Sequence, residues 1–397
     1  MSERKGRLAR FLGGRGMRKL RRDRMAVAAL SVIGVYLAVA LLVLLGGLDR
    51  GDVFDRVGPD TVPGLLGEQD GEKRLADAEF WIEQVERAAR SSNGAEALAA
   101  LRLGGRRAAE GSPEEVLARV DAAWEAFDAV AAFEELETTE VRPLLAELEQ
   151  RVDGLYAEPT GLAGVGQALR LSLGTDRQGR SILFRALYST KVAVQIGIVA
   201  ALISVLIGTL LGAAAGFFGG WVDHLVVWLY STFSSIPWIV LLMVLASMFR
   251  GGSLDGTLIP VYAAFCMSFW ISPCRVVRGE VMKIKELEYV QAASAIGYPS
   301  ARILLRHVVP NTAHLMFINF SLLFIGAIKA EVILSFLGLG VKGEPSWGVM
   351  INQAKAEVLN GFFWQIGAAT FFMVVLVLAF NVLSDALQDA FDPKHVS

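Results

Sequence analysis

Cysteine, histidine and nucleotide-binding motifs are scarce or missing in this sequence. It has two cysteines, Cys266 and Cys274, and four histidines without the spacing of metal ligands. The cysteines are eight residues apart in one apolar run, which is about 12 Å along a helix and too far for a disulfide. No Gly-x-x-x-x-Gly-Lys-Ser/Thr loop and no nucleophile–base constellation occur. We therefore expect no metal, no cofactor and no enzymatic activity.

Charge is also sparse, and this excludes an ordinary soluble protein. Charged residues make up 20% of the chain and hydrophobic residues 54%, with a mean hydropathy of +0.47. Because about 20 apolar residues cross a bilayer core of about 30 Å, the long apolar runs predict membrane spans. We expect six, at residues 25–48, 190–217, 223–249, 258–277, 312–338 and 362–385.

Residues 1–24 carry a cluster of positive charge directly before the first apolar run. Ten of them are Lys or Arg, against Glu3 and Asp23. Nucleic-acid binding is excluded for this arm because it adjoins a span, and the positive-inside rule predicts a cytoplasmic N-terminus. The run 25–48 is too long for a cleaved signal peptide. Six spans then return the C-terminus to the cytoplasm.

Residues 50–170 differ in character from the spans and are expected outside the cytoplasmic membrane. Three segments repeat apolar residues at alternating three- and four-residue steps, which predicts a helical hairpin or short antiparallel coiled coil. The seams are Leu75, Ala78, Ile82, Val85 and Ala89, then Leu117, Val120, Trp124, Phe127 and Ala131, then Val141, Leu145, Leu148, Val152 and Leu155. Turns are predicted at Ser91–Gly94 and at Glu110–Pro113.

One local charge signal disagrees with this topology. Arg177, Arg180, Arg185 and Lys191 precede the second span on its expected outer side. Since the positive-inside rule is a bias of the whole chain, we keep the six-span arrangement.

A polar, helix-prone segment lies at residues 286–311, between two strongly apolar runs. Glu288, Ala292, Ala293 and Gly297 recur at helical spacing, which predicts a face of small side chains that another protein can approach closely. This pattern resembles the EAA coupling loop of ABC-importer permeases. The following Arg306-His307-x-x-Pro310-Asn311 is similar to the peptide-importer branch of that family.

The resemblance covers residues 172–394 and includes four further motifs. One is Leu173-Gly174-Thr175-Asp176-x-x-Gly179-Arg180, and another is the turn Gly216–Asp223. Towards the C-terminus come the block Leu334–Gly340 with the turn Pro345-Ser346-Trp347-Gly348 after it, and a closing Ala379-Phe380-Asn381 with Asp385 and Asp389. Pro237, in the third span, matches a family proline, and Glu331 is an ionisable group in the fifth span. We regard both as candidates for the translocation path.

The resemblance implies an all-α, polytopic membrane protein with the core of a type I ABC-importer permease. Charge, apolar runs and this resemblance together divide the chain into the basic arm 1–24, a first span 25–48, the insert 50–170 and a core 172–390 with the coupling loop 278–311. Coupling to ATPases is implied for Glu288, Ala292, Ala293, Gly297, Arg306 and Pro310.

The implied function is import of di- or oligopeptides across the cytoplasmic (inner) membrane by alternating access. The implied partners are a second homologous permease, two cytoplasmic ATPases, an extracytoplasmic substrate-binding protein and the lipid bilayer. Nickel, glutathione or a peptide antibiotic are alternative cargoes on the same scaffold. A different class, a membrane-anchored sensor or assembly protein working through residues 50–170, is also left open by the sequence.

Overall fold

The computed structural model describes residues 23–57, 71–132, 138–157, 159–248 and 257–391. The basic arm therefore lies outside the described residues except for Asp23 and Arg24. Contacts within the chain define two compact units. One comprises residues 1–45, 189–352 and 370–397, and the other comprises residues 46–188 and 353–369.

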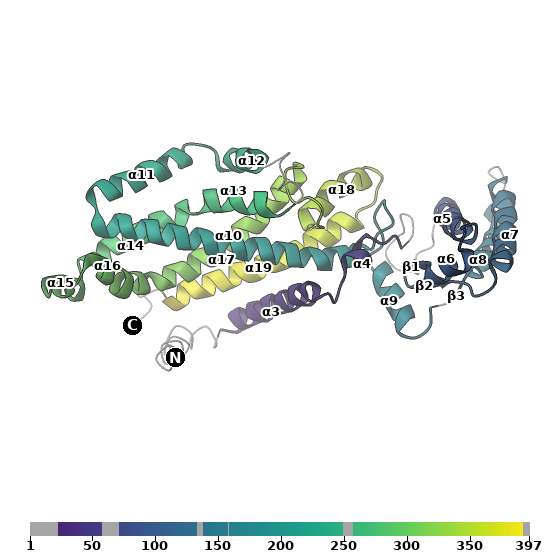
Figure 1. The fold of residues 1–397 in the computed structure, drawn as a ribbon, viewed down its shortest axis with the longest axis horizontal. Helices are drawn as coiled ribbons and strands as arrows, with labels where there is room; N and C mark the ends of the chain where they lie inside the picture. The colour runs from purple at the N-terminus through teal and green to yellow at the C-terminus, as the bar shows by residue number, and fades with distance from the viewer. Residues whose placement is uncertain (1–22, 58–70, 133–137, 158, 249–256, 392–397) are drawn as a thin grey trace. The chain divides into compact units, whose positions relative to one another are not determined.

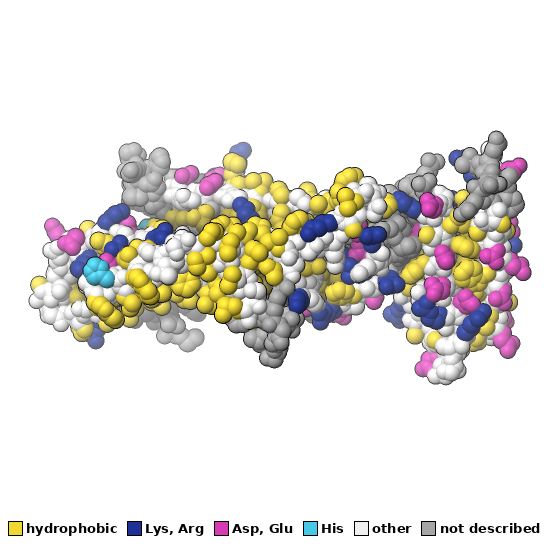
Figure 2. Space-filling view, turned by 90° about the horizontal axis from the view of Figure 1, so that it is seen from above, with side chains coloured by type: hydrophobic (Ala, Val, Ile, Leu, Met, Phe, Trp, Pro, Cys, Tyr) yellow, Lys and Arg dark blue, Asp and Glu magenta, His cyan; other side chains and the backbone are white. Residues whose placement is uncertain are grey.

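Long apolar helices dominate the first unit and confirm the expected multi-span, all-α class (Figure 1). Within the described residues, five helical stretches are long and apolar enough to cross a membrane, or six if one sharply bent pair of helices is counted as a span. The five are Arg24–Leu44, Ile182–Phe218, Ile259–Lys285, Ser300–Phe336 and Trp364–Ala390. The corresponding elements are α3 (Arg24–Leu44), α10 (Ile182–Phe218), α13 (Ile259–Phe269) with α14 (Ile271–Lys285), α17 (Ala313–Phe336) and α19 (Trp364–Phe391). Many large hydrophobic side chains of these helices are exposed, and hydrophobic side chains gather on the face shown in Figure 2, as expected for contact with lipid.

The predicted span 223–249 is not one straight helix. It consists of α11 (Gly220–Ser234) and α12 (Trp238–Met248), bent by 91° at the break between them. Pro237 occupies this break and is exposed. A proline has no N–H for the helical hydrogen bonds and restricts the backbone of the residue before it. The expected kink at Pro237 is therefore confirmed, but the bend of 91° is so sharp that the segment forms two helices and not one kinked span.

Glycines set the distance between α10 and the α13–α14 pair. A Cβ at Gly208 would lie 2.5 Å from the carbonyl oxygen of Trp270, and one at Gly212 would lie 2.4 Å from that of Cys274. At Gly216 it would lie 2.7 Å from the Arg278 carbonyl. This four-residue repeat of small residues brings two helix backbones into direct contact. Gly216 therefore serves helix packing and not the predicted turn, which uses the left-handed backbone of Gly219 and Gly220.

The insert is helical around one apolar core. Its helices are α5 (Gly71–Ala89), α6 (Gly94–Ala100), α7 (Pro113–Ala131) and α8 (Thr138–Asp153). Ile82, Val85, Val116 and Val120 are fully buried in that core. The seams predicted for these helices are confirmed except at Ala131, which is exposed while the preceding Val130 is buried.

A small antiparallel sheet, which the sequence did not predict, completes the insert. Its strands are β1 (Arg102–Leu103), β2 (Arg106–Ala108) and β3 (Tyr156–Ala157), in the order β1-β2-β3. The Tyr156 hydroxyl donates to the carbonyl of Trp81 at 3.0 Å, and burial raises the pKa of that hydroxyl. These contacts join the end of α8 to α5, far apart in sequence.

The second unit also contains the short helices α4 (Arg50–Phe54) and α9 (Leu162–Leu171) and the loop between α18 (Trp347–Leu359) and α19. The Lys73 ammonium lies 4.4 Å from the ring centroid of Phe362, and Trp364 Nε1 donates to the Thr175 carbonyl at 3.0 Å. The insert therefore packs against the residues that join α18 to α19.

Candidate functional site

The segment after α14 folds as a short helix followed by a tight reversal. The helix α15 (Glu288–Ala295) begins after the extended Leu287 and ends before Gly297, whose φ is +88°. The amide of Tyr298 donates to the Ala293 carbonyl at 3.2 Å, and that of Gly297 donates to the Ser294 carbonyl at 3.0 Å. This pair of bonds is a Schellman end, and the positive φ requires glycine. The predicted loop 278–311 is thus shorter, because residues 278–285 belong to α14.

The inner face of α15 packs on its own chain. Val290 and Ala293 are buried in a cluster with Ile284 of α14, Ile303 of α16 (Ser300–Ile303) and Val308. Ala293 is therefore not on the exposed face expected for it. At 100° per residue, five residues from Glu288 rotate the helix by about 140°, which turns Ala293 inward.

The outer face of α15 presents small and apolar groups to the surroundings. Glu288, Ala292 and Gly297 are exposed, as expected. Ile296 is 77% exposed and Tyr289 is 44% exposed on the same element. Since exposed apolar groups beside a rigid backbone are typical of a protein contact surface, this face suits a docked partner.

The two remaining predicted coupling residues lie in an irregular turn before α17. Arg306 is exposed in a π-helical turn, Leu304–Val308, and Pro310 is exposed at the start of a 3-10 turn, Val309–Thr312. Asn311 Nδ2 donates to the Tyr289 hydroxyl at 2.7 Å. This bond ties the turn to α15, so the predicted residues other than Ala293 lie on one connected exposed element.

Glu331 is buried near the end of α17 and its carboxylate is engaged by two hydroxyls. Ser335 Oγ donates to Oε1 at 2.6 Å, and Ser346 Oγ donates to the same oxygen at 2.7 Å. Ser346 Oγ also accepts from the amide of Val349, in the first turn of α18. The carboxylate therefore fastens the connection between α17 and α18. Lys329 is exposed, in keeping with its different helix face.

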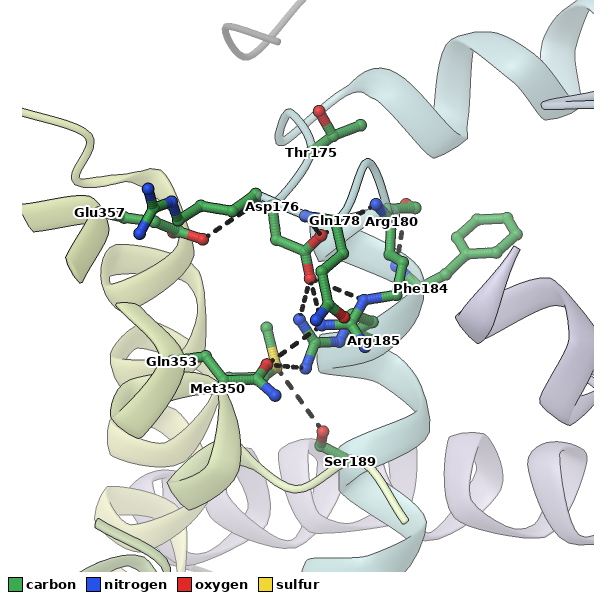
Figure 3. A network of polar contacts seen from close by, with 12 residues as sticks. Thr175, Asp176, Gln178, Arg180, Phe184, Arg185, Ser189, Met350, Gln353 and Glu357 are labelled. Atoms are coloured by element: carbon green, nitrogen blue, oxygen red, sulfur yellow. Dashed lines mark hydrogen bonds and ion pairs between the residues drawn. The ribbon is translucent and has the colours of Figure 1, made fainter. Parts of the chain in front are cut away.

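A buried network of charge lies around the start of α10 (Figure 3). Asp176 Oδ2 accepts from Arg180 Nε at 2.9 Å and also from Arg185 Nη1. Gln353 Oε1 accepts from Arg185 Nη2 at 2.6 Å and from Arg180 Nη2 at 3.2 Å. Two of the four cations that disagreed with the predicted topology are thus buried inside the protein, where they share the carboxylate of Asp176.

Sequence reasoning missed two interactions that hold the spans together. One is the Gly208–Gly212–Gly216 repeat, whose four-residue spacing is a recognisable signal for close helix contact. The other is the ion pair between Arg278 Nε and Asp223 Oδ1 at 2.5 Å, which joins α14 to α11. The pairing itself has no sequence signal, because the two residues lie on different helices. Among the described residues, no group of His, Cys, Asp or Glu is arranged to hold a metal ion.

Comparison with known proteins agrees with these features. Residues 208–396 match the family model described as binding-protein-dependent transport system inner membrane component. The chain is 38% identical over 222 residues to the dipeptide transport system permease protein DppC of Bacillus subtilis, which covers 56% of this chain and 68% of that protein.

Two further relatives are oligopeptide transport system permease proteins OppC. The one from Haemophilus influenzae is 34% identical over 223 residues, 56% of this chain and 70% of that protein. The one from Escherichia coli strain K12 is 35% identical over 223 residues, 56% of this chain and 72% of that protein. The chain therefore belongs to the binding-protein-dependent inner membrane transport components, as a multi-pass permease subunit of the peptide ABC-importer family.

Proposed function

We propose that this permease moves di- or oligopeptides into the cytoplasm by ATP-driven alternating access. It would act with a second, homologous permease, two cytoplasmic ATPases and an extracytoplasmic binding protein. The N- and C-termini and α15 would face the cytoplasm, and the insert would lie outside. The relatives named for dipeptide and oligopeptide transport support the cargo class.

One observation carries the coupling role: α15 is rigidly held on one side and open on the other. Val290 and Ala293 anchor it to α14 and α16, and the Tyr289–Asn311 bond connects it to the turn that leads into α17. A push on the exposed face is therefore transmitted to a span through packed side chains and not through a flexible loop. Because the chain has no phosphate-binding loop, the energy must come from another protein.

The coupling role is tested with Ala292→Arg, which adds a long cation to the exposed face without filling a packed site. We expect normal membrane insertion but a loss of peptide-stimulated ATP hydrolysis and uptake of about tenfold, equivalent to about 1.4 kcal/mol of docking energy. The matched control is Ala76→Arg, at an exposed alanine of α5 in the insert. Full uptake by Ala292→Arg in reconstituted vesicles would contradict the role.

The proposed orientation has its own test. A cysteine replaces Ser92, which is exposed in the turn after α5, and is treated with an impermeant thiol reagent in spheroplasts. Labelling from outside supports an external insert. Labelling only after the membrane is opened would show that the insert lies inside and α15 outside, the opposite of the proposed orientation.

A further inference from the structure

The helix α9 presents an apolar stripe that the described part of the chain leaves uncovered. Leu162 is 92% exposed, Val165 is 59% exposed and Leu169 is 50% exposed, and no residue of this ten-residue helix is buried. At 100° per residue these three side chains lie within about 60° of one another. They therefore form one continuous face and not scattered surface residues.

The other side of α9 is attached to the protein. A Cβ at Gly105, in the turn between β1 and β2, would lie 3.5 Å from the Ala163 carbonyl and 3.9 Å from Gln167 Cβ. The uncovered stripe is thus a specific side of a fixed helix, because the backbone is held against the small sheet of the insert.

The C-terminal end of α9 is tied to residues that flank two spans. Arg170 Nη2 pairs with Asp52 Oδ1 at 2.5 Å, and its guanidinium lies 5.2 Å from the ring centroid of Phe184. Its carbonyl accepts from Ser181 Oγ at 2.6 Å, and Ser181 is the residue directly before α10. Asp52 lies eight residues after Leu44, the last residue of α3.

Through Asp52 and Ser181, the end of α9 is bonded to residues that lie a few positions along the chain from the ends of α3 and α10. With 21 residues, α3 is about 31 Å long, which matches a bilayer core of about 30 Å. The residues after Leu44 therefore emerge at the membrane surface. The helix α9 contains no Asp or Glu, and its single cation, Arg170, is engaged by Asp52. Nothing on the stripe opposes contact with lipid.

We propose that α9 is an interfacial helix that lies in the plane of the bilayer surface, with Leu162, Val165 and Leu169 in the boundary between headgroups and acyl chains. An amphipathic helix of this kind gains free energy from the apolar area that it buries in lipid. Through Arg170 and Ser181 it holds the start of α10 and the base of the insert at a fixed depth. This role depends on the chain being a membrane protein and is independent of its cargo and of the direction of transport.

The test measures lipid contact at the stripe in the assembled transporter, reconstituted in phospholipid nanodiscs. Cys266 and Cys274 are replaced by alanine, and a single cysteine at Val165 or Leu169 carries an environment-sensitive fluorophore. The matched control is a cysteine at Ala163, which is exposed but is turned about 130° from the centre of the stripe. Two quenchers are compared, a lipid with a nitroxide near its headgroup and aqueous iodide.

We expect the labels at Val165 and Leu169 to be quenched by the nitroxide lipid several-fold more than the label at Ala163, and by iodide several-fold less. Equal quenching by iodide at all three positions would show the stripe in water and overturn the proposal. Protection from both quenchers would show that a protein covers the stripe, which also overturns it.

A second variant separates lipid contact from misfolding. Leu162→Asp places a charge on a side chain that is 92% exposed, so no packed contact is lost. We expect several-fold weaker lipid quenching at Leu169 in this variant and unchanged quenching in the matched Leu162→Met. An unchanged signal in Leu162→Asp would mean that the stripe is not seated in lipid.

Discussion

The insert and the spans are both helical, but different forces hold their helices together. In the insert, large side chains such as Ile82 and Val120 are removed from water in a common core. Among the spans, α10 and α14 meet through glycines, with backbone against backbone. An apolar side chain gains little free energy by moving from lipid to a neighbouring helix, because lipid is equally apolar. The spans are therefore held together by close backbone packing and a few polar bonds. The two regions therefore respond differently to the same kind of substitution.

The largest effect is expected at the buried charges of Asp176, Arg180 and Arg185. Asp176→Ala leaves Arg180 and Arg185 buried without their carboxylate. Removing one partner of a buried ion pair costs about 3–5 kcal/mol. We expect a strongly reduced midpoint in thermal unfolding of the detergent-purified protein.

The exposed pair Arg87–Glu83 supplies the control for that substitution, because a surface ion pair contributes about 0–1 kcal/mol. If Glu83→Ala destabilises as much as Asp176→Ala, the buried network has no special importance.

Truncation of a core side chain should affect the insert and spare the spans. Ile82→Ala removes a fully buried side chain and is expected to cost about 2–5 kcal/mol. Hydrogen exchange is expected to increase across α5, α7 and α8 and to stay unchanged in α10 and α14. Glu79→Ala, on the exposed face of α5, is the control. Equal loss of protection in the spans would mean that the two regions unfold together.

Addition of a single methyl group to a glycine should, in contrast, destabilise the spans and spare the insert. Gly212→Ala places a Cβ 2.4 Å from the Cys274 carbonyl and must separate α10 from α14, at a cost of about 1–3 kcal/mol. A disulfide or crosslink engineered between these helices would report the separation. Gly326→Ala in α17 meets nothing within 4 Å and is expected to be neutral or slightly stabilising. Equal behaviour of the two variants would remove the basis for glycine-mediated packing.

The polar bonds of the spans are tested at Glu331. Glu331→Ala leaves the Ser335 and Ser346 hydroxyls without their acceptor, and a buried unsatisfied group costs about 1–3 kcal/mol. Glu331→Gln keeps an oxygen acceptor and is expected to restore most of the thermal stability. A Gln variant as unstable as the Ala variant would show that the carboxylate charge, and not hydrogen bonding, fastens α17 to α18.

The smallest effect concerns a helix end in the insert. Ser112 Oγ accepts from the amide of Glu115, and the Glu115 carboxylate accepts from the amide of Ser112. Ser112→Ala removes the first of these bonds and is expected to cost about 1 kcal/mol, confined to α7. Hydrogen exchange at the first turn of α7 measures it, with Ser112→Asp as the variant that retains a cap.

Local rules predicted the parts of both regions that depend on neighbours in sequence. Apolar run length predicted the spans, and three- and four-residue periodicity predicted the seams of α5, α7 and α8. The end of α15 at Gly297 followed from the need for a residue that accepts positive φ. The 91° break at Pro237 was predicted only as a kink, because a proline weakens a helix without setting the direction in which the chain continues.

The sequence by itself thus determined that this chain crosses the membrane several times, carries a helical insert and presents a short rigid helix between two spans. Only the tertiary structure decided which residues of those helices face one another. It turned Ala293 inward, used Gly216 for packing, buried Asp176 with Arg180 and Arg185, and left one side of α9 uncovered. Hydrophobic periodicity is a property of one segment, whereas an ion pair or a close glycine contact requires two segments, and their meeting is set by the packing of the whole unit.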